Sequence, residues 1–156
     1  MIIRDKHGEI LAESTPESER NFDGLRLAGA NLAHSELEGF SFDGTDLHGS
    51  DFSGADLYWA NLSDSDCSDC SFVGADIRGA ILRGAAFGGA DFREANMSRD
   101  NLNQGLSLIG VDLSQATLEG ANLAGAIYDA TTLLPPGFDP TANEMQLAGA
   151  SAQTTS

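Results

Sequence analysis

Apolar residues recur at every fifth position over a long part of the chain. Seventeen consecutive positions at this spacing, beginning at residue 22, are apolar. These central positions are Phe22, Leu27, Leu32, Leu37, Phe42, Leu47, Phe52, Leu57, Leu62, Cys67, Phe72, Ile77, Leu82, Phe87, Phe92, Met97 and Leu102. A period of five fits neither the 3.6-residue turn of a helix nor the two-residue alternation of a strand. The chain is therefore expected to turn once in every five residues, as a repeat solenoid does.

The other positions of the five-residue unit support this interpretation. Two residues before the centre, Ala, Ser, Thr or Cys stands at thirteen of sixteen positions, and two residues after it Gly stands at ten of seventeen. Asp or Asn is common directly before the centre, and both residue types and Gly favour turns. We expect the centre and the small residue to point inward. The predicted core includes Phe22, Phe42, Phe52, Phe72, Phe92, Leu57, Leu62 and Cys67.

The phenylalanines suggest how many units close one coil. Phe22 and Phe42 are twenty residues apart, as are Phe52, Phe72 and Phe92. A coil of twenty residues would stack them in columns, although a period of ten fits the same spacings.

Units such as 30–34 (ANLAH), 55–59 (ADLYW) and 121–125 (ANLAG) resemble the A(D/N)LXX motif of pentapeptide-repeat proteins. The resemblance extends over residues 20–130 and implies an all-β fold, a right-handed quadrilateral β-helix with four repeats per coil. About five coils would stand ~25 Å tall at ~4.8 Å per strand. The centre after Leu102 is Leu108, six residues on, which predicts a one-residue insertion near residues 103–107, placed at a corner.

The two ends of the repeat region are predicted to be caps. Residues 1–19 are expected to contain a short β-hairpin over the first coil, and residues 20–130 to form the solenoid. Residues 131–156 are expected to be a C-terminal cap and a flexible tail. Pro135 and Pro136 should stop the coil, and the tail should begin at residue 141.

The sequence contains no recognisable catalytic or metal-binding motif. Cys67 and Cys70 form a C-x-x-C pair, but both occupy inward positions, and no second pair completes a zinc site. The acids around Asp66 lack the spacing of a calcium loop, and the three histidines lack a nucleophile beside them. We therefore predict a protein that is not an enzyme and uses no cofactor or metal. No signal peptide or membrane span is recognised, which predicts a soluble, cytoplasmic protein. The family resemblance implies that it is bacterial.

Charge is the main signal outside the repeat. The formal net charge is -16, and no Lys or Arg lies between Leu27 and Ile77, where ten acids stand. Four arginines follow, at positions 78, 83, 93 and 99. Such a potential repels nucleic acid and membrane surfaces and favours a partner protein with a basic surface.

These observations predict a non-catalytic scaffold or protein-interaction module, most simply a monomer. The candidate partner contacts are Tyr58, Trp59, Asp43, Asp46, Asp51, Asp56 and Arg78. Tyr58 and Trp59 form the only adjacent aromatic pair, and exposed aromatic residues are favoured binding anchors. The family resemblance leaves two alternatives open. One is a DNA-mimicking binder of a type II topoisomerase such as gyrase, as in the quinolone-resistance type; the other is a regulator that binds a signalling protein.

Overall fold

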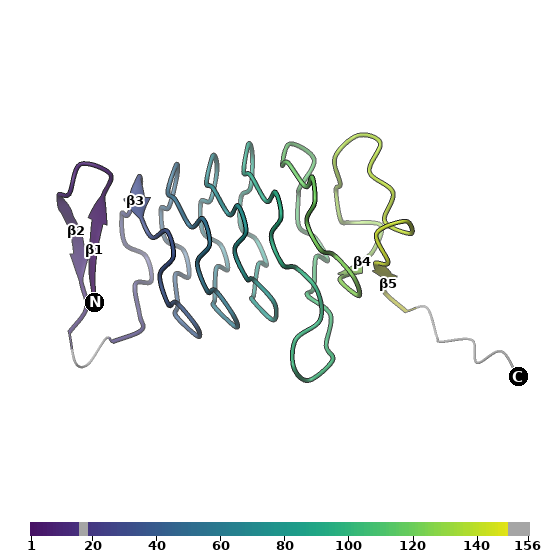
Figure 1. The fold of residues 1–156 in the computed structure, drawn as a ribbon, viewed down its shortest axis with the longest axis horizontal. Coiled ribbons are helices and arrows are strands. Elements are labelled where there is room, and N and C mark those ends of the chain that lie inside the picture. Colours follow the sequence, from purple (N-terminus) through teal and green to yellow (C-terminus); the bar gives the residue numbers. More distant parts are fainter. Residues whose placement is uncertain (16–18, 150–156) are drawn as a thin grey trace, which may run out of the picture.

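The computed structural model describes residues 1–15 and 19–149, and these form an elongated β-solenoid (Figure 1). Successive coils are joined by parallel bridges between residues twenty apart, for example Asn21 to Ser41 and Ser41 to Asn61. Three further ladders of the same spacing begin at Arg26, Asn31 and Glu36. Each coil therefore has four sides of five residues. Within the described ranges no helix is long and apolar enough to cross a membrane.

The interior of the solenoid is a continuous apolar column. All the central positions from Phe22 to Met97 are buried, and so are nearly all the small residues two positions before them. The rings of Phe52 and Phe72 stack with centroids 5.1 Å apart, and those of Phe72 and Phe92 with centroids 4.7 Å apart. Stacking of residues twenty apart selects the twenty-residue coil over the ten-residue alternative. Leu57, Leu62 and Cys67 are also fully buried.

A β-hairpin covers the N-terminal end of the solenoid. Strand β1 (Ile2–Asp5) pairs antiparallel with β2 (Ile10–Glu13) and, on its other edge, with β3 (Ala30–Asn31) of the first coils. The Ile3 side chain is buried against the core. The cap predicted for residues 1–19 includes residues 16–18, which lie outside the described ranges. The hairpin occupies a coil edge that would otherwise expose unpaired backbone groups.

The C-terminal end differs from the expected cap and tail. Strand β4 (Ile127–Tyr128) pairs in parallel with β5 (Gln146–Leu147), and the Gly125 amide donates to the Glu144 carbonyl at 2.9 Å. The ladder is thus interrupted at Pro135 and Pro136 but resumes after them, so the expected stop is wrong. Residues 141–149 belong to this final packed segment, and residues 150–156 of the expected tail are not among those described.

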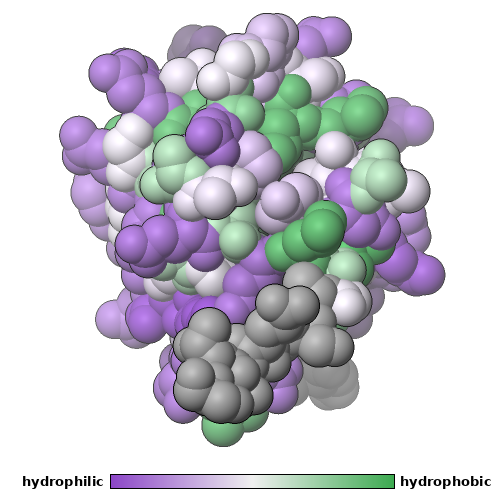
Figure 2. Space-filling model, turned by 90° about the vertical axis from the view of Figure 1, so that its right-hand side faces the viewer, coloured by the Kyte–Doolittle hydropathy of each residue, from purple (hydrophilic) through white to green (hydrophobic). Residues whose placement is uncertain are grey.

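This C-terminal end exposes some apolar surface. Figure 2 looks along the solenoid from this end and shows green hydrophobic residues in the middle of the face, among white and purple ones. Leu133 and Leu147 are about half exposed.

Candidate functional site

The regular coils are interrupted once, by a loop after Met97. Bridges on the C-terminal side of this point join residues 26 apart, such as Asp91 to Thr117, before the spacing returns to twenty between Ser107 and Ile127. The extra length forms a loop over residues 98–106, which protrudes at the lower edge of Figure 1. The predicted one-residue insertion is therefore wrong in size.

The error arises at the last predicted centre, Leu102. Its side chain is 62% exposed, and the next buried apolar residue is Leu106, at 1%. The five-residue spacing continues through Leu102 although the chain has already left the coil. The sequence does indicate this break, at Asp100. The five-residue register requires a small inward residue at this position, and a carboxylate there would be buried without a partner.

Asp100 organises this loop from inside. Its carboxylate accepts hydrogen bonds from the amides of Leu102 (2.9 Å) and Gln104 (2.8 Å). Its own amide donates to the Gln104 carbonyl at 2.9 Å, and its carbonyl accepts from the Asn103 amide at 3.0 Å. The bond from Gln104 is the largest influence that lowers the pKa of Asp100. These hydrogen bonds give the loop a defined conformation and favour the ionised form of Asp100.

Tyr58 and Trp59 hold the loop against the solenoid. The Tyr58 hydroxyl accepts from the Asn101 amide at 2.9 Å, and the Trp59 indole N–H donates to the Asp100 carboxylate at 3.3 Å. The two rings stack with centroids 5.0 Å apart. The guanidinium of Arg78 lies 5.2 Å from the Tyr58 centroid. These residues lie on one side of the solenoid, which we call the loop face: the side of the Glu36–Asp56–Asp76–Asn96 ladder together with loop 98–106.

Arg78 and Trp59 are themselves fixed by contacts. Arg78 forms a two-pronged ion pair with Asp76, with Nη2 2.6 Å from Oδ2 and Nε 2.9 Å from Oδ1. The hydrogen bond to Asp76 is the main cause of a raised pKa for Arg78. The Trp59 ring lies over Gly79, where an added Cβ would stand 2.1 Å from Trp59 Cδ1, yet Trp59 remains 42% exposed. The aromatic pair is ordered and still available to a partner.

The N-terminal part of the loop face is acidic. Glu36 and Asp56 are neighbours in one ladder, and both are exposed, as is Glu38. Together with Arg20 and Phe40 they line a shallow cleft of about 370 Å³. Arg20 lies over the Phe40 ring, with Cζ 5.9 Å from the centroid. The loop face thus presents acids, then aromatic rings, then the loop.

The four candidate aspartates do not form one patch. Asp46, Asp51 and Asp56 belong to three different ladders, and Asp43 lies next to a fourth, which begins at Asn21. The carboxylates of Asp46, Asp51 and Asp56 each accept a hydrogen bond from the amide two residues later, at 3.2, 2.8 and 3.0 Å. They therefore stabilise corners on different sides of the coil, and only Asp56 lies on the loop face.

The described residues contain no group of His, Cys, Asp and Glu arranged to hold a metal ion. Cys67 and Cys70 are both buried and unoxidised, and the Cys70 thiol donates to the Leu47 carbonyl at 3.0 Å. Its interaction with Cys67, followed by burial, raises the pKa of Cys70. A buried thiol with a raised pKa is a poor nucleophile. The ring of exposed His34 lies over Gly54.

A family model described as pentapeptide repeats (8 copies) matches residues 26–64, 60–99 and 104–127. The break between the last two matches falls within loop 98–106. No curated protein matches the chain.

Solved structures of other proteins are similar to this chain. A pentapeptide repeat protein from the thylakoid lumen of Arabidopsis thaliana is 18% identical, with a TM-score of 0.51 and with 83% of this chain and 77% of that chain covered. One from Nostoc PCC 7120 is 32% identical, with a TM-score of 0.33 and coverage of 82% and 84%. QnrB1, a plasmid-mediated fluoroquinolone resistance protein, is 17% identical, with a TM-score of 0.33 and coverage of 88% and 87%. The predicted fold class, a right-handed quadrilateral β-helix, is confirmed.

Proposed function

Because this chain belongs to the pentapeptide-repeat family, we propose that it is a non-catalytic protein-interaction module and that it binds its partner through the loop face. Proteins of this family are generally structural or interaction modules. The observation that carries the proposal is the anchoring of loop 98–106 by Tyr58 and Trp59. A surface loop held rigidly on a scaffold is a common location for binding residues.

The pre-ordering of this loop supports a binding role. A loop that is already hydrogen-bonded loses less conformational entropy when it docks than a mobile one. The loop exposes Leu102, whose side chain is among the most exposed large hydrophobic ones of the described residues. An exposed apolar side chain beside an ordered Trp and Tyr has the composition of an interface centre.

The charges of the loop face indicate the chemistry of the partner. Glu36, Glu38 and Asp56 place negative charge at one end, and the Tyr58 and Trp59 rings follow directly. Carboxylates and aromatic faces both attract the cationic side chains of Lys and Arg. We therefore propose a partner protein with a basic surface, which the net charge of -16 also favours.

The test compares two charge-matched variants in crosslinking capture from the host. Glu36→Gln/Glu38→Gln neutralises exposed acids of the loop face, and Asp64→Asn/Asp69→Asn neutralises two exposed acids at other corners. We expect the first variant to lose most of the captured partner and the second to retain it. Equal loss in both would show that only total charge matters and would contradict the use of this face.

Leu102→Ser tests the loop itself, because it removes this apolar side chain without touching the hydrogen bonds of Asp100. We expect capture to fall at least severalfold, since a central apolar contact of an interface is worth ~1–2 kcal/mol. Capture that is unchanged in Leu102→Ser would remove the loop from the interface. The matched control is Leu133→Ser, an exposed leucine near the C-terminal end.

The topoisomerase-binding alternative has less support in the structure. A DNA mimic requires unbroken negative charge, whereas Arg78, Arg83, Arg93 and Arg99 follow the acidic coils. The second alternative, a signalling protein as partner, is compatible with the loop face and would be identified by the same capture experiment.

A further inference from the structure

The coils separate directly after loop 98–106, and clefts lie between them on two neighbouring sides, that of Ile81 and Ser107 and that of Ala86 and Asp112. Along the ladder that begins at Asn21, bridges join Asn61 to Ile81 and Ser107 to Ile127. In the part of the chain that the structure describes, no bridge joins Ile81 to Ser107. This side, which carries Ile81 and Ser107, is a different side from the loop face.

The missing hydrogen bonds can be identified from the intact coils below. One coil earlier, the Leu62 amide donates to the Ile81 carbonyl at 2.8 Å, the Ile81 amide to the Ala60 carbonyl at 2.9 Å, and the Asp64 amide to the Arg83 carbonyl at 2.9 Å. Across the gap, the equivalent bonds would run from the Leu82 amide to the Ser107 carbonyl and from the Gly84 amide to the Ile109 carbonyl. A third would run from the Ser107 amide to the Ala80 carbonyl. None of these is formed among the described residues.

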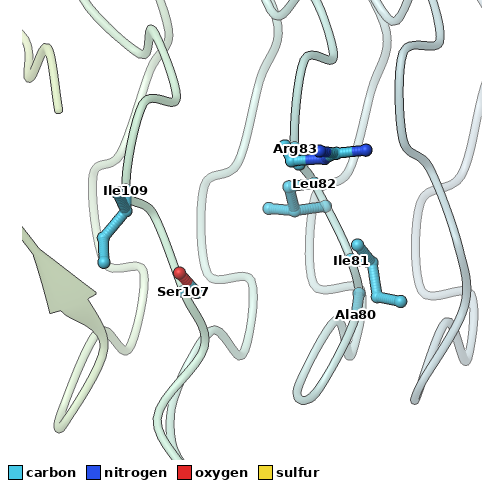
Figure 3. A pocket seen from close by; sticks show the side chains of 6 residues that line it. All are labelled: Ala80, Ile81, Leu82, Arg83, Ser107 and Ile109. Atoms are coloured by element: carbon cyan, nitrogen blue, oxygen red, sulfur yellow. The ribbon is translucent and has the colours of Figure 1, made fainter. Parts of the chain in front are cut away.

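The separation leaves a cleft of about 320 Å³ between the two coils. Ala80, Ile81, Leu82 and Arg83 line one rim, and Ser107 and Ile109 line the other, as Figure 3 shows. Ile81 is 53% exposed and Ile109 is 43% exposed. The rims therefore combine unpaired backbone donors and acceptors with aliphatic side chains.

We propose that this cleft binds an extended peptide segment of a partner protein, which adds one parallel strand between the two coils. Addition of a strand to an exposed sheet edge is a general mode of peptide recognition, in which backbone hydrogen bonds supply affinity and side-chain contacts supply specificity. Because each rim of the cleft is the edge of a coil, one inserted peptide strand would pair with both coils. The backbone groups of Leu82, Gly84 and Ser107 would regain partners that every regular coil provides.

The residues along the rims determine which side chains the peptide should carry. In a parallel ladder, its first residue would lie between Ile81 and Ser107, and its second would point inward beside Leu82. Both should be aliphatic. The third would lie between Arg83 and Ile109. Arg83 forms no ion pair within the described ranges, and its guanidinium points away from Ile109 (Figure 3). An acidic third residue would complement this charge once the Arg83 side chain turns from that position toward the cleft.

The sequence aliphatic–aliphatic–acidic is therefore the expected recognition motif. The probe is the labelled peptide acetyl-Thr-Val-Leu-Glu-Thr-amide, in which Val, Leu and Glu take these three places. We expect saturable binding to the whole protein below about 1 mM, with slower amide hydrogen exchange at Leu82 and Gly84 in the complex. The control peptide is N-methylated at Val and Leu, which removes the donors for the Ala80 and Ser107 carbonyls and should abolish binding.

A charge exchange tests the side-chain register. Arg83→Glu should weaken binding of the Glu peptide about tenfold and favour the peptide in which Lys replaces Glu. The matched control is Arg93→Glu, which changes an arginine beside the intact ladder that joins Asp91 to Thr117 and should leave binding unchanged.

Closing the cleft is the complementary test. Deletion of residues 99–104 returns the spacing between Leu82 and Leu108 to twenty and places Gly105 at the corner. This variant should bind no peptide. If it does not fold, the N-methylated peptide and Arg83→Glu still decide the matter. The loop-face variant Glu36→Gln/Glu38→Gln should bind the peptide normally, which separates this proposal from the proposed function.

Three results would overturn the proposal. They are absence of binding below about 1 mM, equal binding of the N-methylated peptide, and equal binding by the deletion variant. Sedimentation of the unliganded protein adds a fourth: a dimer that disappears on deletion of residues 99–104 would show that a second copy, and not a partner peptide, occupies the cleft.

Discussion

At several corners a residue with a side chain replaces glycine, and this side chain lies against the next coil. Among the described residues, seven that are not glycine adopt positive φ, and five of these face a glycine one coil further along the solenoid. The pairs are His34 with Gly54, Trp59 with Gly79, Asp64 with Gly84, Asp69 with Gly89, and Glu94 with Gly120. At the first four glycines, an added Cβ would lie 2.0 to 2.4 Å from the facing side chain. At Gly54 and Gly79 the added Cβ would meet a ring, so glycine is required there for space as well as for backbone conformation, whereas the Asp64 and Asp69 side chains can turn aside.

Two glycines at the same kind of corner separate these two requirements. Gly74 and Gly79 have φ of 66° and 68°, but a Cβ at Gly74 would meet nothing within 4 Å. We expect Gly74→Ala to cost about 1 kcal/mol from the left-handed backbone alone. Gly79→Ala should cost about 1 kcal/mol more, because the Trp59 ring must move. Denaturant unfolding measures both, and the extra cost should vanish when Gly79→Ala is combined with Trp59→Ala. Equal costs for the two single variants would show that Trp59 moves freely.

At the scale of the element, loop 98–106 changes the structure on two neighbouring sides of the solenoid. Its base is fixed on the loop face by Tyr58 and Trp59, while its exit displaces Ser107 from the ladder of Ile81. One insertion therefore creates both an ordered loop and an open ladder. The two features are physically linked, because the chain that leaves the loop pairs with Ile127 and not with Ile81.

The ionisation of Asp100 should control the order of this loop. Hydrogen bonds, above all from the Gln104 amide, lower the pKa of Asp100, with a further contribution from the charge of Arg78. A carboxyl group with a lowered folded-state pKa stabilises the fold above its unfolded pKa of about 3.9, and the stabilisation is lost as the pH falls through the folded value. The loop should therefore stay ordered at neutral pH and loosen in acid below about pH 3.9.

The fluorescence of Trp59 reports this transition, because Trp59 is the only tryptophan and contacts Asp100. We expect its emission to change in acid before the β-sheet circular dichroism does. Asp100→Asn should remove this separate step. If the emission and the circular dichroism change together in the unmodified protein, the loop does not open independently of the coils.

For the whole molecule, the regular coils could be predicted from sequence because each unit repeats the same physical requirements. An inward apolar centre such as Phe72, a small neighbour such as Ala75 and a corner glycine such as Gly74 recur at fixed spacing. The loop could not be located correctly, because Leu102 preserves the spacing after the chain has left the ladder. The contacts of Tyr58 and Trp59 with residues more than forty positions away have no counterpart in the local pattern.

The distribution of charge over the molecule leads to the last prediction, that micromolar protein leaves gyrase supercoiling unchanged. A duplex carries one negative charge per ~1.7 Å on all sides, whereas the six coil levels of the ladder from Arg26 to Leu133 span only ~24 Å. Arg83 and Arg99 interrupt even this length, and three of the candidate aspartates are engaged at corners. Circular dichroism should verify that the tested protein is folded. Inhibition that weakens with salt and disappears when Asp43, Asp46, Asp51 and Asp56 are all changed to Asn would contradict this expectation, because only charge mimicry combines those two properties.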